Sequence, residues 1–104
     1  MIKYEVNLEI NKTIDENFLE WLPHHIDEIL KFKGFQNASI FTDNSCDSEL
    51  YCKITVHYEL DSREDLQNYF DNHATTMRDK TVKMFGDNFK ASRRILELTK
   101  KFYK

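Results

Sequence analysis

The chain of 104 residues contains only two glycines, and each follows a stretch in which apolar residues recur with helical spacing. Gly34 comes after the run 14–33, and Gly86 comes after the run 66–85. A residue at positive φ commonly ends a helix, and glycine reaches positive φ without the steric penalty of a Cβ atom. We therefore predict two helices, each ending at one of the two glycines.

Both predicted helices begin with the pattern of a capping box, in which a hydroxyl and an acidic residue three positions later satisfy free backbone amides. Thr13 and Glu16 form this pattern before the first helix, and Ser62 and Asp65 form a weaker version before the second. Pro23 lies inside the first helix and removes one of its backbone hydrogen bonds. We expect a kink or a break there.

Apolar and polar residues alternate in most of the remaining chain, which is typical of strands with one buried face. The alternation is clear at 2–10 and 50–60, weaker at 35–42, and present again at 88–98. The order is therefore strand, helix, strand, strand, helix, strand. It predicts an α+β, ferredoxin-like βαββαβ fold, a four-stranded antiparallel sheet with two helices on one face. Residues 1–98 would form this single domain and residues 99–104 a C-terminal tail.

Composition excludes several classes of protein. No run approaches the ~20 apolar residues of a membrane span, and the first residues lack the apolar core of a secretory signal. Two cysteines, Cys46 and Cys52, are too few for a disulfide framework. We expect a cytoplasmic protein with free thiols and no membrane partner.

Nucleic acid is also an unexpected partner, although RNA-recognition domains share the same order of elements. Those domains stack bases on aromatic residues of the free sheet face, whereas Tyr4 falls in the buried phase of its strand. The free face instead carries Glu5, Glu9 and Glu59, and the net charge is −3. Binding to phosphates depends on lysine and arginine, so we predict no nucleic-acid binding.

The four histidines do not form the pattern of a metal site. His24 and His25 are adjacent, so a regular helix points them in different directions. A zinc or iron site needs three or four converging ligands, and neither cysteine has a histidine nearby in sequence. We expect no metal and no cofactor.

Arg93 is the charged residue that the strand pattern singles out. It is followed directly by Arg94, and consecutive strand residues point to opposite faces. Its phase with the apolar residues Ala91 and Ile95 places Arg93 on the helix side. There it either pairs with an acidic side chain or helix carbonyls, or it lines a pocket and binds an anion. In the second case His73 and Tyr69 would complete the ligand-binding site.

Several segments resemble a bacterial single-domain family known only as a domain of unknown function. The most specific are Phe85-Gly86 and Ser92-Arg-Arg-Ile-Leu96, and the likeness extends over about residues 1–98. The family is similar to the dimeric α+β barrels, which pair two ferredoxin-like sheets face to face. The resemblance implies a homodimer joined through the mixed-charge free face, and it implies no catalytic residue.

Two functions remain open from the sequence. One is a homodimeric module that binds a small anionic ligand or a partner without established catalysis. The other is a cofactor-independent enzyme of the dimeric-barrel type, an oxygenase or isomerase acting on a small apolar or anionic compound. Arg93 would then hold the substrate and His73 would act as acid or base. A pocket of roughly 300 Å³ or more would favour ligand binding, and a filled core would favour an interaction protein.

Overall fold

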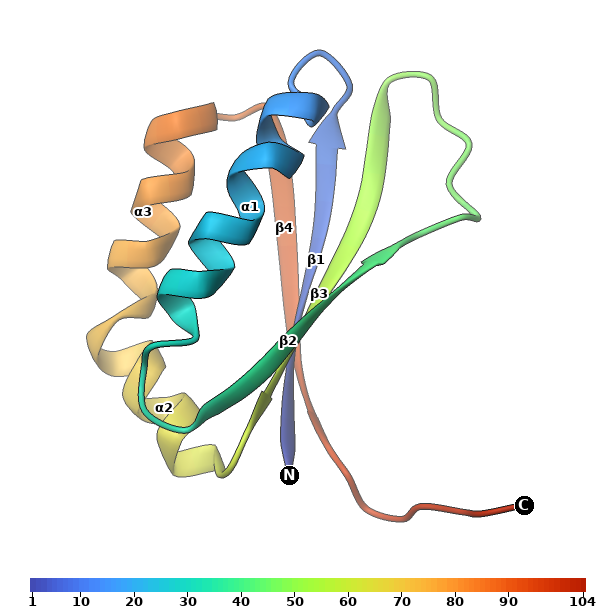
Figure 1. Cartoon of the computed structure of the whole chain (residues 1–104). Helices are drawn as coiled ribbons and strands as arrows, with labels where there is room; N and C mark the ends of the chain where they lie inside the picture. Colours follow the sequence, from blue (N-terminus) through green and yellow to red (C-terminus); the bar gives the residue numbers. More distant parts are fainter.

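Four antiparallel strands form one sheet in the order β2-β3-β1-β4 in the computed structural model, which describes all residues 1–104 (Figure 1). The strands are β1 (Ile2–Asn11), β2 (Phe35–Thr42), β3 (Tyr51–Leu60) and β4 (Phe89–Glu97). Three helices, α1 (Asp15–Ile29), α2 (Arg63–Asn72) and α3 (Ala74–Phe85), cover one face of the sheet. The predicted ferredoxin-like arrangement is confirmed, with three helices in place of two.

The central strands place their even-numbered residues toward the helices, as the alternation predicts. Tyr4 pairs with Tyr58 and Val6 with Val56 between β1 and β3, and Tyr4 and Tyr58 are buried. The core is completed by apolar side chains from all three helices, namely Phe18, Leu22, Ile26, Ile29, Leu66, Tyr69, Ala74, Met77 and Phe85. The opposite face of the sheet has no helix over it.

The predicted single helix over 66–85 is wrong, because the helix is interrupted at His73. This residue has φ −132° and ψ −30°, outside helical geometry, and it separates α2 from α3. The bend allows Tyr69 before it and Met77 after it to be buried in the same core. At the far end the prediction holds: Gly86 has φ 60°, and its N–H donates to the Val82 carbonyl at 2.7 Å.

The two predicted capping boxes have different outcomes. Ser62 is the N-cap of α2, and its hydroxyl accepts a hydrogen bond from the Asp65 N–H at 3.1 Å. The cap predicted at Thr13 is wrong: α1 begins after Ile14, and the Thr13 amide and hydroxyl both bind Asn11 Oδ1 at 2.9 Å. A turn that leaves β1 at Asn11 has already used the Thr13 hydroxyl.

The end of α1 also differs from the prediction. The helix stops at Ile29, and Gly34, at φ 88°, lies in the turn that leads into β2. A side chain at Gly34 would collide with Asp65 at the start of α2, so glycine is required here by close approach as well as by backbone conformation. Of the kink or break predicted at Pro23, the break is wrong, since α1 continues through Pro23 and Leu22 and Ile26 on either side are buried.

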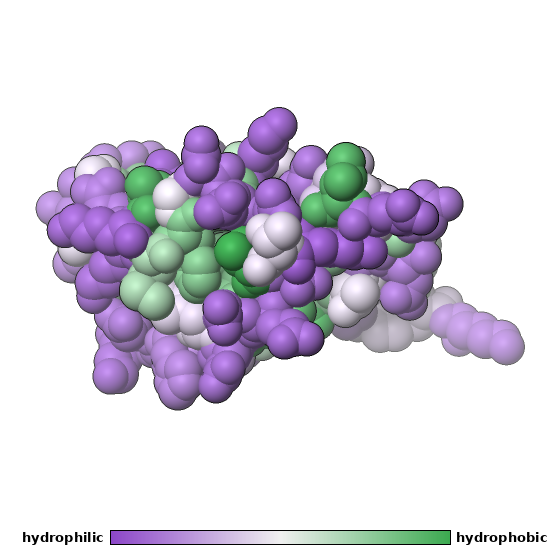
Figure 2. All heavy atoms as spheres, turned by 90° about the horizontal axis from the view of Figure 1, so that it is seen from above, coloured by the Kyte–Doolittle hydropathy of each residue, from purple (hydrophilic) through white to green (hydrophobic).

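Residues 98–104 have no regular secondary structure and extend away from the body of the molecule (Figure 1). Phe102 and Tyr103 in this segment are exposed. Polar residues cover most of the surface seen from above, with apolar residues visible between them (Figure 2). None of the three helices combines the length and apolar character needed to cross a bilayer.

Candidate functional site

A cavity of about 330 Å³ lies between the helices and the sheet. Most of its wall is apolar or aromatic. The polar residues are few: His25 from α1, Arg78 and Thr81 from α3, and Arg93 from β4. The remaining wall consists of Tyr4, Val6, Leu8, Phe18, Trp21, Leu22, Ile29, Val56, Tyr58, Tyr69, Met77, Val82, Phe89 and Ala91. The core is therefore not filled, which is the outcome that favours ligand binding.

Two clusters of aromatic rings form part of the wall. Tyr4 stacks on Tyr58 with 5.8 Å between ring centroids and lies 6.3 Å from Tyr69. In the second cluster, Phe18 lies 5.8 Å from Trp21 and 5.5 Å from Phe89. Phe89 is opposite Ile10 of β1. Ile10 follows Tyr4 by six residues, so the two clusters are separated by roughly 20 Å along the strand. The cavity thus runs along the sheet between two aromatic clusters.

The hydroxyls of Tyr58 and Tyr69 in the first cluster stay protonated at neutral pH. Burial raises the pKa of Tyr69 to about 12, and it raises the pKa of Tyr58 further. The positive charge of Arg93 opposes this rise at both residues. A protonated phenol donates and accepts hydrogen bonds, so these side chains offer neutral polar atoms in a largely apolar wall.

Arg93 lines the cavity from β4, on the helix side of the sheet as predicted. It forms no ion pair, and no acidic side chain lines the cavity. The side chain is exposed, because β4 is an edge strand. Of the two roles left open by the sequence, pairing with an acid is therefore not observed.

Arg78 is a second cation at the cavity that sequence reasoning missed. Its Nη2 lies 3.4 Å from the Tyr4 hydroxyl, and its guanidinium carbon lies 5.9 Å from the centre of the Phe70 ring. A continuous helix over 66–85 would place Arg78 one position outside the inner face, in solvent. Arg78 does lie at an exposed position next to the buried Met77, and from there its side chain reaches the cavity wall.

The three residues predicted as ligand-binding are only partly brought together. Tyr69 and Arg93 both line the cavity. His73 does not line it: its ring stacks on Phe32, with 4.0 Å between centroids and 14° between planes. His73 is thus placed at the junction of α2 and α3 and away from the two residues with which it was grouped.

His25 is the histidine that does reach the cavity. It is 8% exposed, and its Nδ1 is buried without a hydrogen-bond partner. The ring stacks on Trp21 one helical turn earlier, at 4.5 Å between centroids and 23° between planes. Burial lowers the pKa of His25 to about 4, so the ring is neutral at pH 7. Its position four residues after Trp21 and four before Ile29, both apolar, is the sequence signal for this placement.

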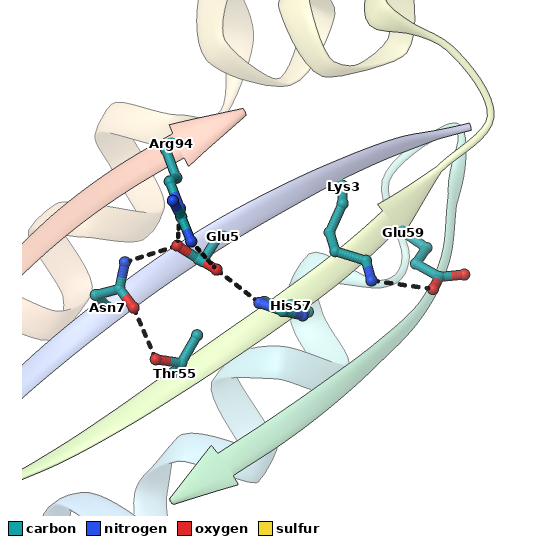
Figure 3. A network of polar contacts seen from close by, with 7 residues as sticks. All are labelled: Lys3, Glu5, Asn7, Thr55, His57, Glu59 and Arg94. Carbon is teal, nitrogen blue, oxygen red and sulfur yellow. Dashed lines mark hydrogen bonds and ion pairs between the residues drawn. The ribbon is translucent and has the colours of Figure 1, made fainter. Parts of the chain in front are cut away.

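A network of polar side chains occupies the centre of the open face (Figure 3). Glu5 of β1 is only 5% exposed, although it belongs to the polar phase of its strand. Its carboxylate accepts hydrogen bonds from the Arg94 guanidinium, from His57 Nε2 at 2.8 Å and from Asn7 Nδ2 at 3.0 Å. The Arg94 hydrogen bond is the main cause that holds the pKa of Glu5 at about 2, and burial opposes it.

Cross-strand register explains this network. Glu5 is directly opposite His57 on β3 and Arg94 on β4, and opposed side chains of a sheet face lie within contact distance. The network continues outward, since the Thr55 hydroxyl donates to Asn7 Oδ1 at 2.7 Å. The sequence predicted these residues on the open face but not the burial of Glu5, because the register between strands was not known.

Metal binding receives no support from the arrangement of side chains, since no three His, Cys, Asp or Glu residues converge. Cys46 and Cys52 are free and half-buried. Cys46 lies in the polar segment 43–49 and Cys52 in the apolar phase of the strand pattern 50–60, which predicts an accessible Cys46 and a buried Cys52. That prediction is wrong, because both are half-buried. The Cys46 thiol lies 4.0 Å from the Tyr51 carbonyl at the start of β3.

The model of the family DUF4286, described as a domain of unknown function, matches residues 1–99. The chain therefore belongs to this family, and the suspected resemblance is confirmed. No curated protein matches the sequence.

Solved structures with the same fold are similar in shape but distant in sequence. One is provisionally assigned as an antibiotic biosynthesis monooxygenase from Deinococcus radiodurans; it has a TM-score of 0.76 and 11% identity, covering 100% of this chain and 98% of that one. A dimeric ferredoxin-like protein from an uncultured marine organism has a TM-score of 0.74 and 11% identity, with 97% of each chain covered. SnoaB, a cofactor-independent oxygenase from Streptomyces nogalater, has a TM-score of 0.72 and 6% identity, covering 99% and 98%. These similarities show the fold.

Proposed function

We propose that this DUF4286 protein binds a small, largely apolar anion in the cavity between its helices and its sheet. The observation that carries the proposal is Arg93, a cation on an aromatic cavity wall with no acidic partner. A guanidinium is permanently charged and presents paired N–H donors that match a carboxylate. Arg78 adds a second cation beside Tyr4, so the cavity offers positive charge to one end of an aromatic acid.

The apolar part of such a ligand fits the rest of the wall. A volume of about 330 Å³ lies at the lower end of the range for small-molecule sites. The rings of Tyr4, Tyr58, Phe18 and Trp21 provide flat surfaces for an aromatic ligand. Tyr69 contributes a neutral hydroxyl close enough to Arg93 for its pKa to respond to that charge.

Thermal unfolding in the presence of aromatic acids tests this proposal. Benzoate and 2-naphthoate at millimolar concentration should raise the Tm of the wild type, because a ligand that binds only the native state stabilises it. Arg93→Met should lose this response, whereas Lys90→Met, on the opposite face of the same strand, should keep it. Benzyl alcohol serves as the uncharged comparison. Equal responses in the wild type and Arg93→Met would overturn the proposal.

We also propose that two copies pair through the open faces of their sheets, as the resemblance to dimeric α+β barrels implies. A similar structure is described as a dimeric ferredoxin-like protein. Interfaces of this kind combine ordered polar groups with exposed apolar residues. Here the Glu5 network is already ordered, and Phe41, beside His57, is 50% exposed.

Sedimentation equilibrium at tens of micromolar tests the pairing. The wild type should be a dimer, and Lys53→Glu, which reverses a charge on the open face, should weaken it, more at low salt. Lys83→Glu on α3 makes the same change on the helix side and should leave the dimer intact. A monomeric wild type would contradict the pairing.

We propose that the protein is located in the cytoplasm, where its two free thiols would persist.

The second candidate function is catalysis without a cofactor, on the same ligand. It is favoured by His25, a neutral histidine on the cavity wall, and by the likeness of the fold to SnoaB. We assign the acid or base of that hypothesis to His25 and not to His73, because of the two only His25 lines the cavity. Incubating the protein with an acid that raises its Tm, followed by mass spectrometry, should reveal a product, and His25→Phe should abolish its formation. An unchanged acid leaves binding as the function.

A further inference from the structure

The cavity contains a polar atom that the protein itself leaves without a partner. His25 Nδ1 is buried and forms no hydrogen bond, and it is the one buried side-chain nitrogen or oxygen in the structure in this condition. The great majority of buried polar side-chain atoms have a partner, and an exception calls for an explanation. The ring also lines the cavity, so a bound molecule is the available partner.

The ring is held in place by its neighbours. Stacking on Trp21 at 4.5 Å restricts its rotation, and Leu22 and Ile26 beside it in α1 are buried. Glu28 and Lys80 are the charged groups that act on the pKa of His25, and they form an ion pair with each other at 2.7 Å. They are therefore engaged with one another, and the imidazole stays neutral with one N–H donor and one lone-pair acceptor.

We infer that the aromatic acid bound in this cavity carries a hydroxyl group that pairs with a ring nitrogen of His25. This inference rests on the proposed function and specifies its ligand class as a hydroxy-substituted aromatic carboxylate. The carboxylate would meet Arg93 and Arg78 from β4 and α3, and the hydroxyl would meet His25 from α1. A hydroxyl both donates and accepts, so it satisfies His25 in either neutral tautomer.

The three polar groups come from three different elements, which gives the cavity a means of discrimination. An acid without the hydroxyl would leave His25 unpaired, while an aromatic alcohol without the carboxylate would leave the arginines unpaired. A site built to hydrogen-bond a hydroxyl rejects the analogue that lacks it more strongly than an apolar site rejects a change in size. Loss of one such hydrogen bond corresponds to about a tenfold change in affinity.

Isothermal titration with matched acids tests the inference. Benzoate is compared with 3- and 4-hydroxybenzoate, and 2-naphthoate with its 3-, 6- and 7-hydroxy derivatives, so that the position of the hydroxyl is sampled. The wild type should bind at least one hydroxy acid about tenfold more tightly than its parent. His25→Phe, which keeps a flat ring, should lose the preference, so that it binds the hydroxy acid no more tightly than the parent acid. His24→Phe, an exposed neighbour, should retain it.

The outcomes separate this inference from the proposed function. If the wild type binds parent and hydroxy acids equally, or if His25→Phe keeps the preference, the cavity still binds aromatic anions and the role of His25 is wrong. If no acid binds to the wild type, the proposed function fails and the inference fails with it. Circular dichroism of His25→Phe verifies that the variant is folded. His25→Asn, which restores a polar atom, is the second variant in which the affinities for the hydroxy acid and its parent are compared.

Discussion

Arg93 and Arg94 are neighbours on β4, yet the two faces of the sheet treat them differently. On the open face, Arg94 donates two hydrogen bonds to Glu5, a buried carboxylate that is also held by His57 and Asn7. On the helix side, Arg93 faces aromatic rings and has no acidic partner. The same residue type is thus part of a completed network on one face and available to a ligand on the other.

The difference gives a criterion for separating charged side chains that stabilise the fold from those that are free to bind a ligand: whether the protein itself supplies their partners. Glu5 has three partners, and removing it would leave them without acceptors. Arg93 has no protein partner, so its removal takes away little that stabilises the fold. The helix side also holds the unpaired His25, and both unpaired groups line one cavity. We therefore expect the completed contacts on the open face to stabilise the fold, and under the proposed function the unpaired groups in the cavity would bind the ligand.

The largest effect on stability should come from Glu5→Ala. This change leaves Arg94, His57 and Asn7 without their common acceptor, and we expect the free energy of unfolding to fall by about 2 kcal/mol. Urea denaturation of the wild type and the variant measures the change. Glu9→Ala, on the same face of β1 and without an ion pair, is the matched control and should change stability little. Equal losses in the two variants would show that the network contributes nothing.

Lowering the pH should reduce the stability first through His25 on the helix side of the sheet and then, at lower pH, through Glu5 on the open face. His25 has a pKa of about 4 in the folded chain against 6.5 ordinarily, so the unfolded chain takes up a proton that the native state excludes. Stability should therefore fall between about pH 6.5 and 4, by on the order of 2 kcal/mol. Glu5, with a pKa of about 2 against 4.5 ordinarily, stabilises above pH 4.5 and loses this contribution from there toward pH 2.

Urea denaturation at several pH values between 7 and 4.5 checks the first range. His25→Phe should remove the loss in that range, because it removes the group that titrates. His24→Phe should leave the loss unchanged, since His24 is exposed. A loss of the same size in His25→Phe and the wild type would assign it to another group.

A smaller effect is expected at the edge of the network. Thr55→Val removes the hydroxyl that donates to Asn7 Oδ1 at 2.7 Å and keeps the branched shape suited to a strand. We expect a loss of about 1 kcal/mol in the free energy of unfolding. Thr42→Val, at the end of β2, tests the same exchange at an exposed strand position outside the network. A change no larger than in this control would limit the network to Glu5 and its direct partners.

The smallest effect should be that of Arg93→Met in the absence of ligand. Because no acid pairs with Arg93, we expect the free energy of unfolding to change by no more than about 0.5 kcal/mol. Arg94→Met should lower it, since that change breaks the contacts with Glu5. Thermal melts of both variants measure the comparison directly. A greater loss in Arg93→Met than in Arg94→Met would reverse the roles that we assign to the two faces.

Local patterns in the sequence predicted much of the fold. Period-two alternation placed the four strands to within one or two residues, and Ser62 and Gly86 marked the start of α2 and the end of α3. The face of the sheet to which Arg93 points was predictable as well, because neighbouring strand residues alternate regardless of what surrounds them. These features depend on backbone geometry and on residues a few positions apart, so the sequence alone was sufficient.

Tertiary contacts decided the rest. His73 interrupts the predicted second helix and stacks on Phe32, and the exposed Arg78 reaches the Tyr4 hydroxyl 74 positions away. Glu5 is buried because the register sets it between His57 and Arg94, 52 and 89 positions away. The cavity exists because three helices leave space over the sheet between two aromatic clusters. Periodicity is a local property that a sequence displays directly, whereas burial, pairing and empty space depend on which distant residues meet, and only the folded chain determines that.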